Sequence, residues 1–203
     1  MSDGAILVTV GGGKGGVGKS VVSTNLGVAL ARIGLRTVLV DADLGAANLH
    51  TMLSVDRPVT TLWSLIEKQV TTLEEAVVAT CEPRLFLVPG ALAVVGAANP
   101  THTQKLKLLS HLRRLDADVV VIDLGAGTSY LTLDMFDAGD VRLVVTTPQL
   151  TALQNAYAFA KGAVHRAIRA AATDEEEREI VEQASDRTET ERVSQLVERI
   201  RAR

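Results

Sequence analysis

The sequence contains only one cysteine, Cys81, in 203 residues. A disulfide within the chain is therefore excluded, and so is a zinc or iron–sulfur site built from several cysteines of one chain. This scarcity favours a reducing, cytoplasmic setting. We expect Cys81 itself to be a small buried or half-buried hydrophobic side chain.

Aromatic residues are also scarce, at 3% of a chain that is 47% hydrophobic. Aliphatic side chains and alanine must therefore fill the core, and the short valine-rich runs are typical of buried parallel strands. The N-terminus lacks the basic start of a signal peptide, and no apolar run reaches the roughly 20 residues of a membrane span. A formal net charge of −3 and a pI of about 5.8 argue against a chain-wide surface for polyanions.

Short apolar runs alternate with segments of helical periodicity along the first 172 residues. The helix-compatible segments span 20–34, 60–80, 101–115, 129–137 and 151–172, and the strand-like runs are 5–10, 37–43, 84–90, 118–127 and 141–148. This alternation predicts an α/β fold with a mostly parallel β-sheet and helices on both faces. In such sheets ligands bind at the carboxyl ends of the strands, where this sequence places its Gly- and Asp-bearing turns.

The composition changes near Thr173. Residues 174–203 hold ten acidic and six basic residues, which is typical of a solvated helix or helix pair. We therefore expect two parts, a P-loop domain over residues 1–173 and a charged helical C-terminal segment over residues 174–203.

The stretch GGGKGGVGKS contains a phosphate-binding loop, because Gly13, Gly18, Lys19 and Ser20 fit the pattern G-x-x-x-x-G-K-[ST] between a strand and a helix. Glycines let backbone N–H groups approach phosphate oxygens, and the helix N-terminus adds a partial positive charge. Lys19 would neutralise the β- and γ-phosphates, and the Ser20 hydroxyl would ligate Mg²⁺. The expected nucleotide-binding residues are Gly13, Lys14, Gly15, Gly16, Val17, Gly18, Lys19, Ser20 and Val21.

Three carboxylates end predicted strands near this loop. Asp123 follows four apolar residues, as a residue of the Mg²⁺ shell would, and Asp41 and Asp43 end the second strand. One of the latter two could orient or deprotonate an attacking water. A single Asp after a strand is more often a helix N-cap, but three such carboxylates beside a P-loop favour a metal–phosphate site.

Four segments, 14–20, 41–49, 122–127 and 146–157, carry a family resemblance. Together they resemble the MinD/ParA family of deviant Walker A ATPases, and the last three are most similar to its FlhG-like branch. The resemblance implies a P-loop NTPase that uses ATP and Mg²⁺, forms an ATP-dependent homodimer, and hydrolyses ATP slowly unless a partner stimulates it.

The same resemblance assigns roles to individual residues. Lys14 would reach across the dimer to the phosphates of the partner subunit's ATP, where it would act like an arginine finger. Asp43 would polarise the attacking water, and Asp123 would open the second switch region. The expected catalytic residues are then Lys14, Lys19 and Asp43, and the expected metal-site residues are Ser20, Asp43 and Asp123. The alternative for Lys14 is a solvated loop lysine.

Two departures from the family pattern stand out. Val21 replaces a hydroxyl-bearing residue, so its backbone N–H can still bind phosphate but a side-chain contact is lost. No strand-like run follows Thr147, whereas the resemblance implies a further strand beside the adenine. We therefore expect a C-terminally shortened version of the fold.

The resemblance implies a spatial regulator that positions a polar flagellum or pilus, a division site or another cargo, with an activator or cargo protein as partner. The alternative is a non-hydrolysing nucleotide-binding scaffold, or a truncated domain that acts by binding partners. Iron–sulfur carriers on the same scaffold need more cysteines, and amidating synthases need a further glutaminase domain that 203 residues cannot supply.

Two surfaces suggest platforms for such a regulator. Segment 193–200 has apolar residues at helical spacing between arginines, as a membrane-surface helix would, but a helix packed on the domain explains it better. A basic cluster on predicted helix 101–115 suggests nucleic acid, but a solvated helix face explains it better. The residues are Val193, Leu196, Val197 and Ile200 for the first, and Lys105, Lys107, Arg113 and Arg114 for the second. The expected location is cytoplasmic, with peripheral attachment to a membrane or cell pole as the weaker alternative.

Overall fold

A six-stranded sheet forms the centre of the computed structural model, which describes residues 4–43, 47–56, 58–90 and 101–172. The strand order is β3-β4-β2-β5-β1-β6, and every neighbouring pair is parallel except β3 with β4. The strands are β1 (Ile6–Gly11), β2 (Thr37–Ala42), β3 (Val78–Ala79), β4 (Leu85–Val88), β5 (Val119–Leu124) and β6 (Val141–Val144). The predicted α/β class with a mostly parallel sheet is confirmed.

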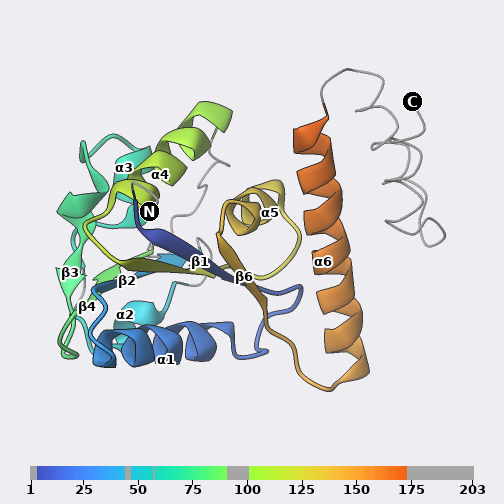
Figure 1. Ribbon diagram of the computed structural model, residues 1–203, viewed down its shortest axis with the longest axis horizontal. Coiled ribbons are helices and arrows are strands. Elements are labelled where there is room, and N and C mark those ends of the chain that lie inside the picture. The colour runs from blue at the N-terminus through green and yellow to red at the C-terminus, as the bar shows by residue number, and fades with distance from the viewer. Residues whose placement is uncertain (1–3, 44–46, 57, 91–100, 173–203) are drawn as a thin grey trace.

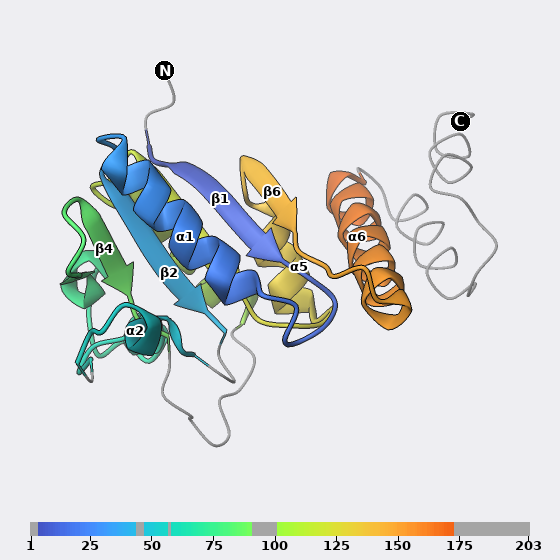
Figure 2. The ribbon, with the colours of Figure 1, turned by 90° about the horizontal axis from the view of Figure 1, so that it is seen from below.

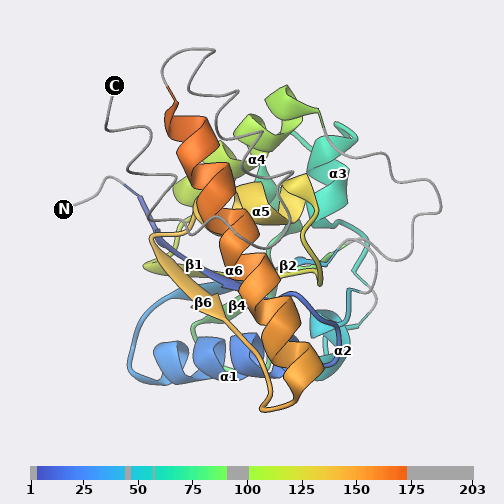
Figure 3. The ribbon, with the colours of Figure 1, turned by 90° about the vertical axis from the view of Figure 1, so that its right-hand side faces the viewer.

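Helices cover both faces of this sheet (Figure 1). Helices α1 (Lys19–Arg32) and α2 (Leu49–Met52) lie on one face, and α3 (Leu62–Ile66), α4 (His102–Arg114) and α5 (Tyr130–Asp137) lie on the other. Helix α6 (Leu150–Ala171) stands beyond β6 and beside α5, as the two rotated views also show (Figures 2 and 3). Within the described residues, no helix is both long and apolar enough to cross a membrane.

The central strand β5 shows why this sequence builds a two-sided sheet. All six of its residues are buried, and successive side chains point to opposite faces. Val119 and Val121 pack with the core under α1, whereas Val120 and Ile122 pack with the core under α3, α4 and α5. A strand covered on both faces favours apolar side chains on both sides, which explains the unbroken run VVVI that precedes Asp123.

The expected helix over 60–80 was wrong in its extent, because the chain divides there into α3 and a 3-10 helix, Leu73–Ala76. Each piece begins with its own capping box, at Thr61 and at Thr72. Lys68 has a positive φ of 60°, which ends the first piece. Cys81 was also predicted wrongly, because it is exposed in the turn between β3 and β4. The expected segment 174–203 lies outside the described residues.

Strand register brings the acidic strand ends together. Asp123 of β5 pairs in register with Val10 of β1 and with Asp41 of β2. The glycine loop continues directly from β1, so it emerges at the same edge of the sheet as both carboxylates. This edge is where ligands bind in parallel α/β sheets.

Candidate functional site

The phosphate loop leaves β1 after Gly11 and enters α1 at Lys19. Gly16 and Gly18 have φ values of 75° and 96°, a conformation that glycine adopts without steric cost. A Cβ added to Gly15, Gly16 or Gly18 would meet nothing within 4 Å, so this half of the loop borders open space. No side chain caps the start of α1, which leaves its first N–H groups for an anion.

Lys19 and Asp123 form the buried floor of this space. Lys19 is 7% exposed and Asp123 is 1% exposed. Burial raises the pKa of Asp123, whereas hydrogen bonds from Ser20 and Ser23 and the charge of Lys19 lower it, and the charge of Asp43 raises it further. The pKa of Asp123 lies above its ordinary value as the net result. The predicted residues Lys19, Ser20, Asp43 and Asp123 are therefore close enough to interact electrostatically.

This donor set fits Mg²⁺ bound together with nucleotide phosphates. Among the residues that the structure describes, no three His, Cys, Asp or Glu side chains cluster as a metal site on their own. Mg²⁺ is usually held by one or two carboxylates together with substrate phosphates and water, and it does not need a dedicated cage of protein ligands. Ser20 and Asp123, with Asp43 nearby, supply that limited set.

The two aspartates of β2 and the following loop play different parts. Asp41 is 1% exposed, and its carboxylate accepts backbone hydrogen bonds from Asp43 (3.2 Å), Asn48 (2.9 Å) and Leu49 (3.0 Å). It therefore fastens the loop and the start of α2. Burial raises the pKa of Asp41 to about 6, against the opposing effect of these hydrogen bonds.

Asp43 is half-buried and stands over the loop that follows β5. Its carboxylate oxygen lies 3.3 Å from the position that a Cβ on Gly125 would occupy. The glycine loop touches this same segment, because the Gly127 N–H donates to the Gly12 carbonyl at 3.3 Å. The sequence left Asp41 and Asp43 open as the water-orienting residue, and the geometry favours Asp43 because Asp41 is occupied by backbone N–H groups.

Lys14 lies apart from this phosphate floor. Its ammonium group donates to the Thr151 hydroxyl in the first turn of α6, at 3.3 Å. The glycines before it are packed, since a Cβ at Gly13 would come 2.0 Å from the Asn155 carbonyl oxygen. The two lysines of the loop therefore have different surroundings, one buried at the floor and one held at the rim by another helix.

Two polar residues of the site were missed at the level of sequence. The Ser23 hydroxyl, fully buried, lies 2.9 Å from Asp123 Oδ1 and 3.1 Å from the Lys19 carbonyl oxygen. Thr151 contacts Lys14 across 137 positions of sequence. The position of Ser23 four residues after Lys19 places both on one side of α1, which is a weak signal that could have singled it out.

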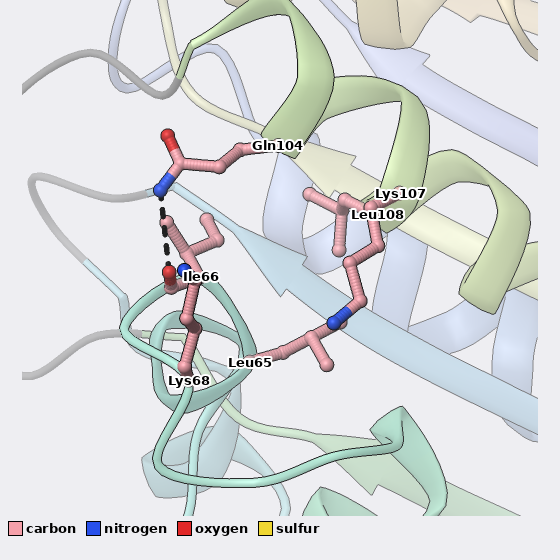
Figure 4. Close-up of a pocket in the computed structure, with 6 residues that line it drawn as sticks. All are labelled: Leu65, Ile66, Lys68, Gln104, Lys107 and Leu108. Carbon is pink, nitrogen blue, oxygen red and sulfur yellow. Dashed lines mark hydrogen bonds between the residues drawn. The ribbon is translucent and has the colours of Figure 1, made fainter.

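Two of the four residues of the basic cluster on α4 are engaged within the protein. Lys105 pairs with Asp134 of α5, and Arg113 pairs with Asp140 and with the Ala138 carbonyl. A shallow groove between α3 and α4 is lined in part by Lys107, and Gln104 donates across it to the Ile66 carbonyl at 3.3 Å (Figure 4). Segment 193–200, the other expected surface, lies outside the described residues.

Comparisons with known proteins identify the family of this chain. A family model described as "ParA: NUBPL iron-transfer P-loop NTPase" matches residues 5–163. The antiactivator FleN of Pseudomonas aeruginosa is 36% identical over 166 residues, which cover 76% of this chain and 55% of FleN. The flagellum site-determining protein YlxH of Helicobacter pylori is 33% identical over 166 residues, which cover 76% of this chain and 52% of YlxH.

Solved structures give the same result. The septum site-determining protein MinD of Pyrococcus horikoshii, in complex with Mg-ADP, superposes with a TM-score of 0.69 at 27% identity, over 77% of this chain and 64% of that one. A cobyrinic acid a,c-diamide synthase of Mycobacterium smegmatis, with a bound ATP analogue and magnesium, superposes with a TM-score of 0.69 at 26% identity, over 78% of this chain and 67% of that one. The chain spans about half the length of the curated relatives it matches.

Proposed function

Because this chain belongs to the MinD/ParA family of P-loop ATPases, we propose that it is an ATP-dependent dimerisation switch that hydrolyses ATP slowly. The observation that carries the proposal is the separation of its two loop lysines. Lys19 lies buried beside Asp123, where it can serve the nucleotide of its own subunit. Lys14 lies at the rim of the loop and can serve the nucleotide of a second subunit.

Residues of the glycine loop and of the strand ends take different parts in the proposed hydrolysis. Backbone N–H groups of residues 15–20 and the Lys19 ammonium bind the β- and γ-phosphates and neutralise their charge. Ser20 and Asp123 would hold Mg²⁺, which would neutralise further phosphate charge. Asp43 brings a carboxylate to the water that attacks the γ-phosphorus. The bond between the γ-phosphorus and the bridging oxygen breaks, which leaves ADP and phosphate.

Lys14 completes the site only in the dimer. A lysine supplied by the partner subunit stabilises the charge on the transferring phosphoryl group, as an arginine finger does. Hydrolysis then depends on the meeting of two chains, and loss of the γ-phosphate releases them. This is a two-state switch in which nucleotide biases one arrangement over the other.

The cellular output that we propose is the positioning or number control of a polar machine such as a flagellum or pilus. Support comes from YlxH, which is named as a flagellum site-determining protein, from FleN, which is named as an antiactivator, and from MinD proteins named for septum-site determination. A MinD of Aquifex aeolicus has been solved in complex with MinC, at 26% identity to this chain, and we propose an activator or cargo protein in the corresponding role here. We place the switch in the cytoplasm, with a membrane or pole as its docking platform.

The description of the matching family includes iron transfer, which is the competing assignment. One observation disfavours it in this chain. Cys81, the only cysteine, precedes β4, at the amino ends of the parallel strands and at the opposite edge of the sheet from the phosphate loop. One exposed thiol per chain at that edge cannot supply a cluster of several thiolates beside the nucleotide.

Light scattering after size-exclusion chromatography, with ADP and with ATP, tests the switch. We expect the wild-type chain to dimerise only with ATP, and Asp43→Ala to accumulate the ATP dimer because it hydrolyses poorly. Lys19→Ala should abolish nucleotide binding, whereas Lys14→Ala should bind ATP as a monomer but neither dimerise nor turn over. Lys107→Ala, which removes an exposed lysine of α4, is the matched control and should behave as wild type.

A Lys14→Ala variant that dimerises with ATP would exclude the role in trans. ATP-dependent dimerisation without measurable turnover in the wild-type chain would instead favour the non-hydrolysing scaffold.

A further inference from the structure

The six glycines of the loop around Lys14 fall into two groups. Gly15, Gly16 and Gly18, which follow Lys14, have no neighbour within 4 Å of an added Cβ and border open space. Gly11, Gly12 and Gly13, which precede it, are packed against the β6–α6 unit, within 3 Å of an added Cβ. Lys14 therefore stands at the boundary between a packed half-loop and an open half-loop.

Each glycine of the packed half lies against a different residue of the β6–α6 unit. An added Cβ would lie 2.6 Å from the Phe159 ring at Gly11, 2.8 Å from the Val145 carbonyl oxygen at Gly12, and 2.0 Å from the Asn155 carbonyl oxygen at Gly13. Figures 1 and 2 both place the β1–α1 loop beside the N-terminal half of α6. Backbone approach this close is open only to glycine.

Helix α6 is anchored to α5 at two positions. Phe159 is fully buried and meets Phe136 of α5 edge to face, with ring centroids 4.9 Å apart. Further along, Arg166 pairs with Asp134 of α5. The first turn of α6 therefore presents Thr151 at a fixed place beside the loop, and the Asn155 side chain donates to the Thr151 carbonyl at 2.7 Å.

From this arrangement we propose that Thr151 is a positioning residue that holds Lys14 within its own subunit until a second subunit with ATP competes for it. The inference rests on the proposed function, because it assigns a regulatory contact to the same lysine. The Thr151 hydroxyl accepts from the Lys14 ammonium at 3.3 Å, so the lysine must leave this acceptor before it can reach a phosphate of the partner subunit. The packing of Gly11, Gly12 and Gly13 against the β6–α6 unit keeps the Lys14 ammonium close to the Thr151 hydroxyl.

The expected size of the effect follows from the equilibrium between held and released lysine. A hydrogen bond from a charged donor favours the held form, and exposure to water reduces the ratio of held to released lysine to about one to two at this site, so that about one half to one third of the lysines are released. The apparent dissociation constant of a complex rises by the reciprocal of the competent fraction. Because each of the two subunits must release its lysine, the dimer dissociation constant should fall roughly four- to tenfold when the acceptor is removed.

Thr151→Val tests the proposal, since valine keeps the shape of threonine and lacks the hydroxyl, and Thr151→Ser restores the acceptor. With ATP, we expect Thr151→Val to dimerise at a protein concentration about four- to tenfold below that of wild type. In the nucleotide-free protein, acetylation of Lys14 by an activated ester, read by mass spectrometry against Lys107, should be about two- to threefold faster in Thr151→Val. Thr151→Ser should return both values toward those of wild type.

The direction of the change separates this role from a merely structural one, because damage to α6 would weaken the dimer instead of strengthening it. The holding role alone would be overturned if Thr151→Val dimerised at the same protein concentration as wild type and its Lys14 were acetylated at the same rate, while the wild-type chain dimerised normally. A weaker dimer in Thr151→Val would also overturn it. A wild-type chain that stays monomeric with ATP would overturn the proposed function and the holding role with it.

Discussion

The buried hydroxyl of Ser23 gives the sharpest test of how this site is built. One O–H proton lies within reach of two acceptors, Asp123 Oδ1 at 2.9 Å and the Lys19 carbonyl oxygen at 3.1 Å, and it can serve only one of them at a time. An ionised carboxylate is the stronger acceptor. We therefore expect the hydroxyl to stabilise the charged form of Asp123, and Ser23→Ala to remove that stabilisation.

The magnitude follows from the burial of both groups. A hydrogen bond to a charged group contributes about 1.5–3 kcal/mol, and no solvent can replace the missing donor because Ser23 is 0% and Asp123 is 1% exposed. Ser23→Ala should therefore lower the free energy of unfolding by about 2 kcal/mol at about pH 8. For a chain of this size that loss corresponds to roughly 4–8 °C in melting temperature.

The loss should depend on pH with a definite sign. Because burial raises the pKa of Asp123 above its ordinary value, the folded protein gains stability as pH falls through the folded pKa and the carboxyl takes up a proton. The neutral carboxyl no longer needs the strong donor, and the Ser23 hydroxyl can turn to the Lys19 carbonyl. The cost of Ser23→Ala should consequently shrink as pH is lowered from about 8 to a value below the pKa of Asp123 in the folded protein.

Urea unfolding of four chains, wild type, Ser23→Ala, Asp123→Asn and the double variant, measures the coupling directly. We expect the cost of Ser23→Ala to be at least about 1 kcal/mol smaller in the Asp123→Asn background, because Asn at this position carries no charge. Equal costs in both backgrounds and at both pH values would refute the reasoning. They would mean that the hydroxyl acts only on the backbone of α1.

Three further predictions concern the supports of the site. Asp134→Asn should destabilise the protein by about 1–2 kcal/mol near neutral pH, and urea unfolding should show the difference vanish as pH falls through the pKa of Asp134 in the folded protein. Burial alone would raise the pKa of Asp134, but its two cationic partners hold that pKa below its ordinary value, so the stabilisation is lost as pH falls through it. Gly11→Ala should cost about 1–3 kcal/mol because the new Cβ would lie 2.6 Å from the Phe159 ring, and Phe159→Leu in the same chain should recover part of the loss in melting temperature. Between about pH 4.5 and about pH 7.5, the free energy of unfolding of Asp41→Asn should rise relative to that of wild type by up to about 3 kcal/mol. Burial raises the pKa of Asp41 from 3.8 to about 6, so its ionisation over this range destabilises the folded wild-type protein.

The sheet was predictable from sequence because its strands are buried on both sides. The runs around β1, β2, β4 and β5 are apolar at nearly every position, a pattern that a solvated helix cannot tolerate. Segment 60–80 was less tractable, because its apolar residues fit a helix while two threonines, each with a polar partner three residues later, start separate short pieces. Local capping outweighed helical periodicity there.

The site divides along a similar line. Lys19 and Ser20, at the start of α1, could be predicted from sequence because they belong to one contiguous motif with its glycines. Ser23 and Thr151 act through partners 100 and 137 positions away, and no spacing rule relates such distances. The resemblance assigned the water-polarising role to Asp43, but the part of Asp41 in fastening the loop required the positions of its three backbone donors.

The glycine run itself shows how one loop can couple three elements. Gly12 accepts a hydrogen bond from Gly127, in the loop after β5, while its Cα abuts the Val145 carbonyl at the end of β6. The following half of the loop opens toward the phosphate space at the N-terminus of α1. Because the contacts on Gly12 leave no room for a side chain, a phosphate-driven shift of the loop must move against the β5 loop and β6–α6 together. The motif requires glycine for the phosphate at only part of this stretch, and the remaining glycines are explained by these contacts with the elements that would report the nucleotide.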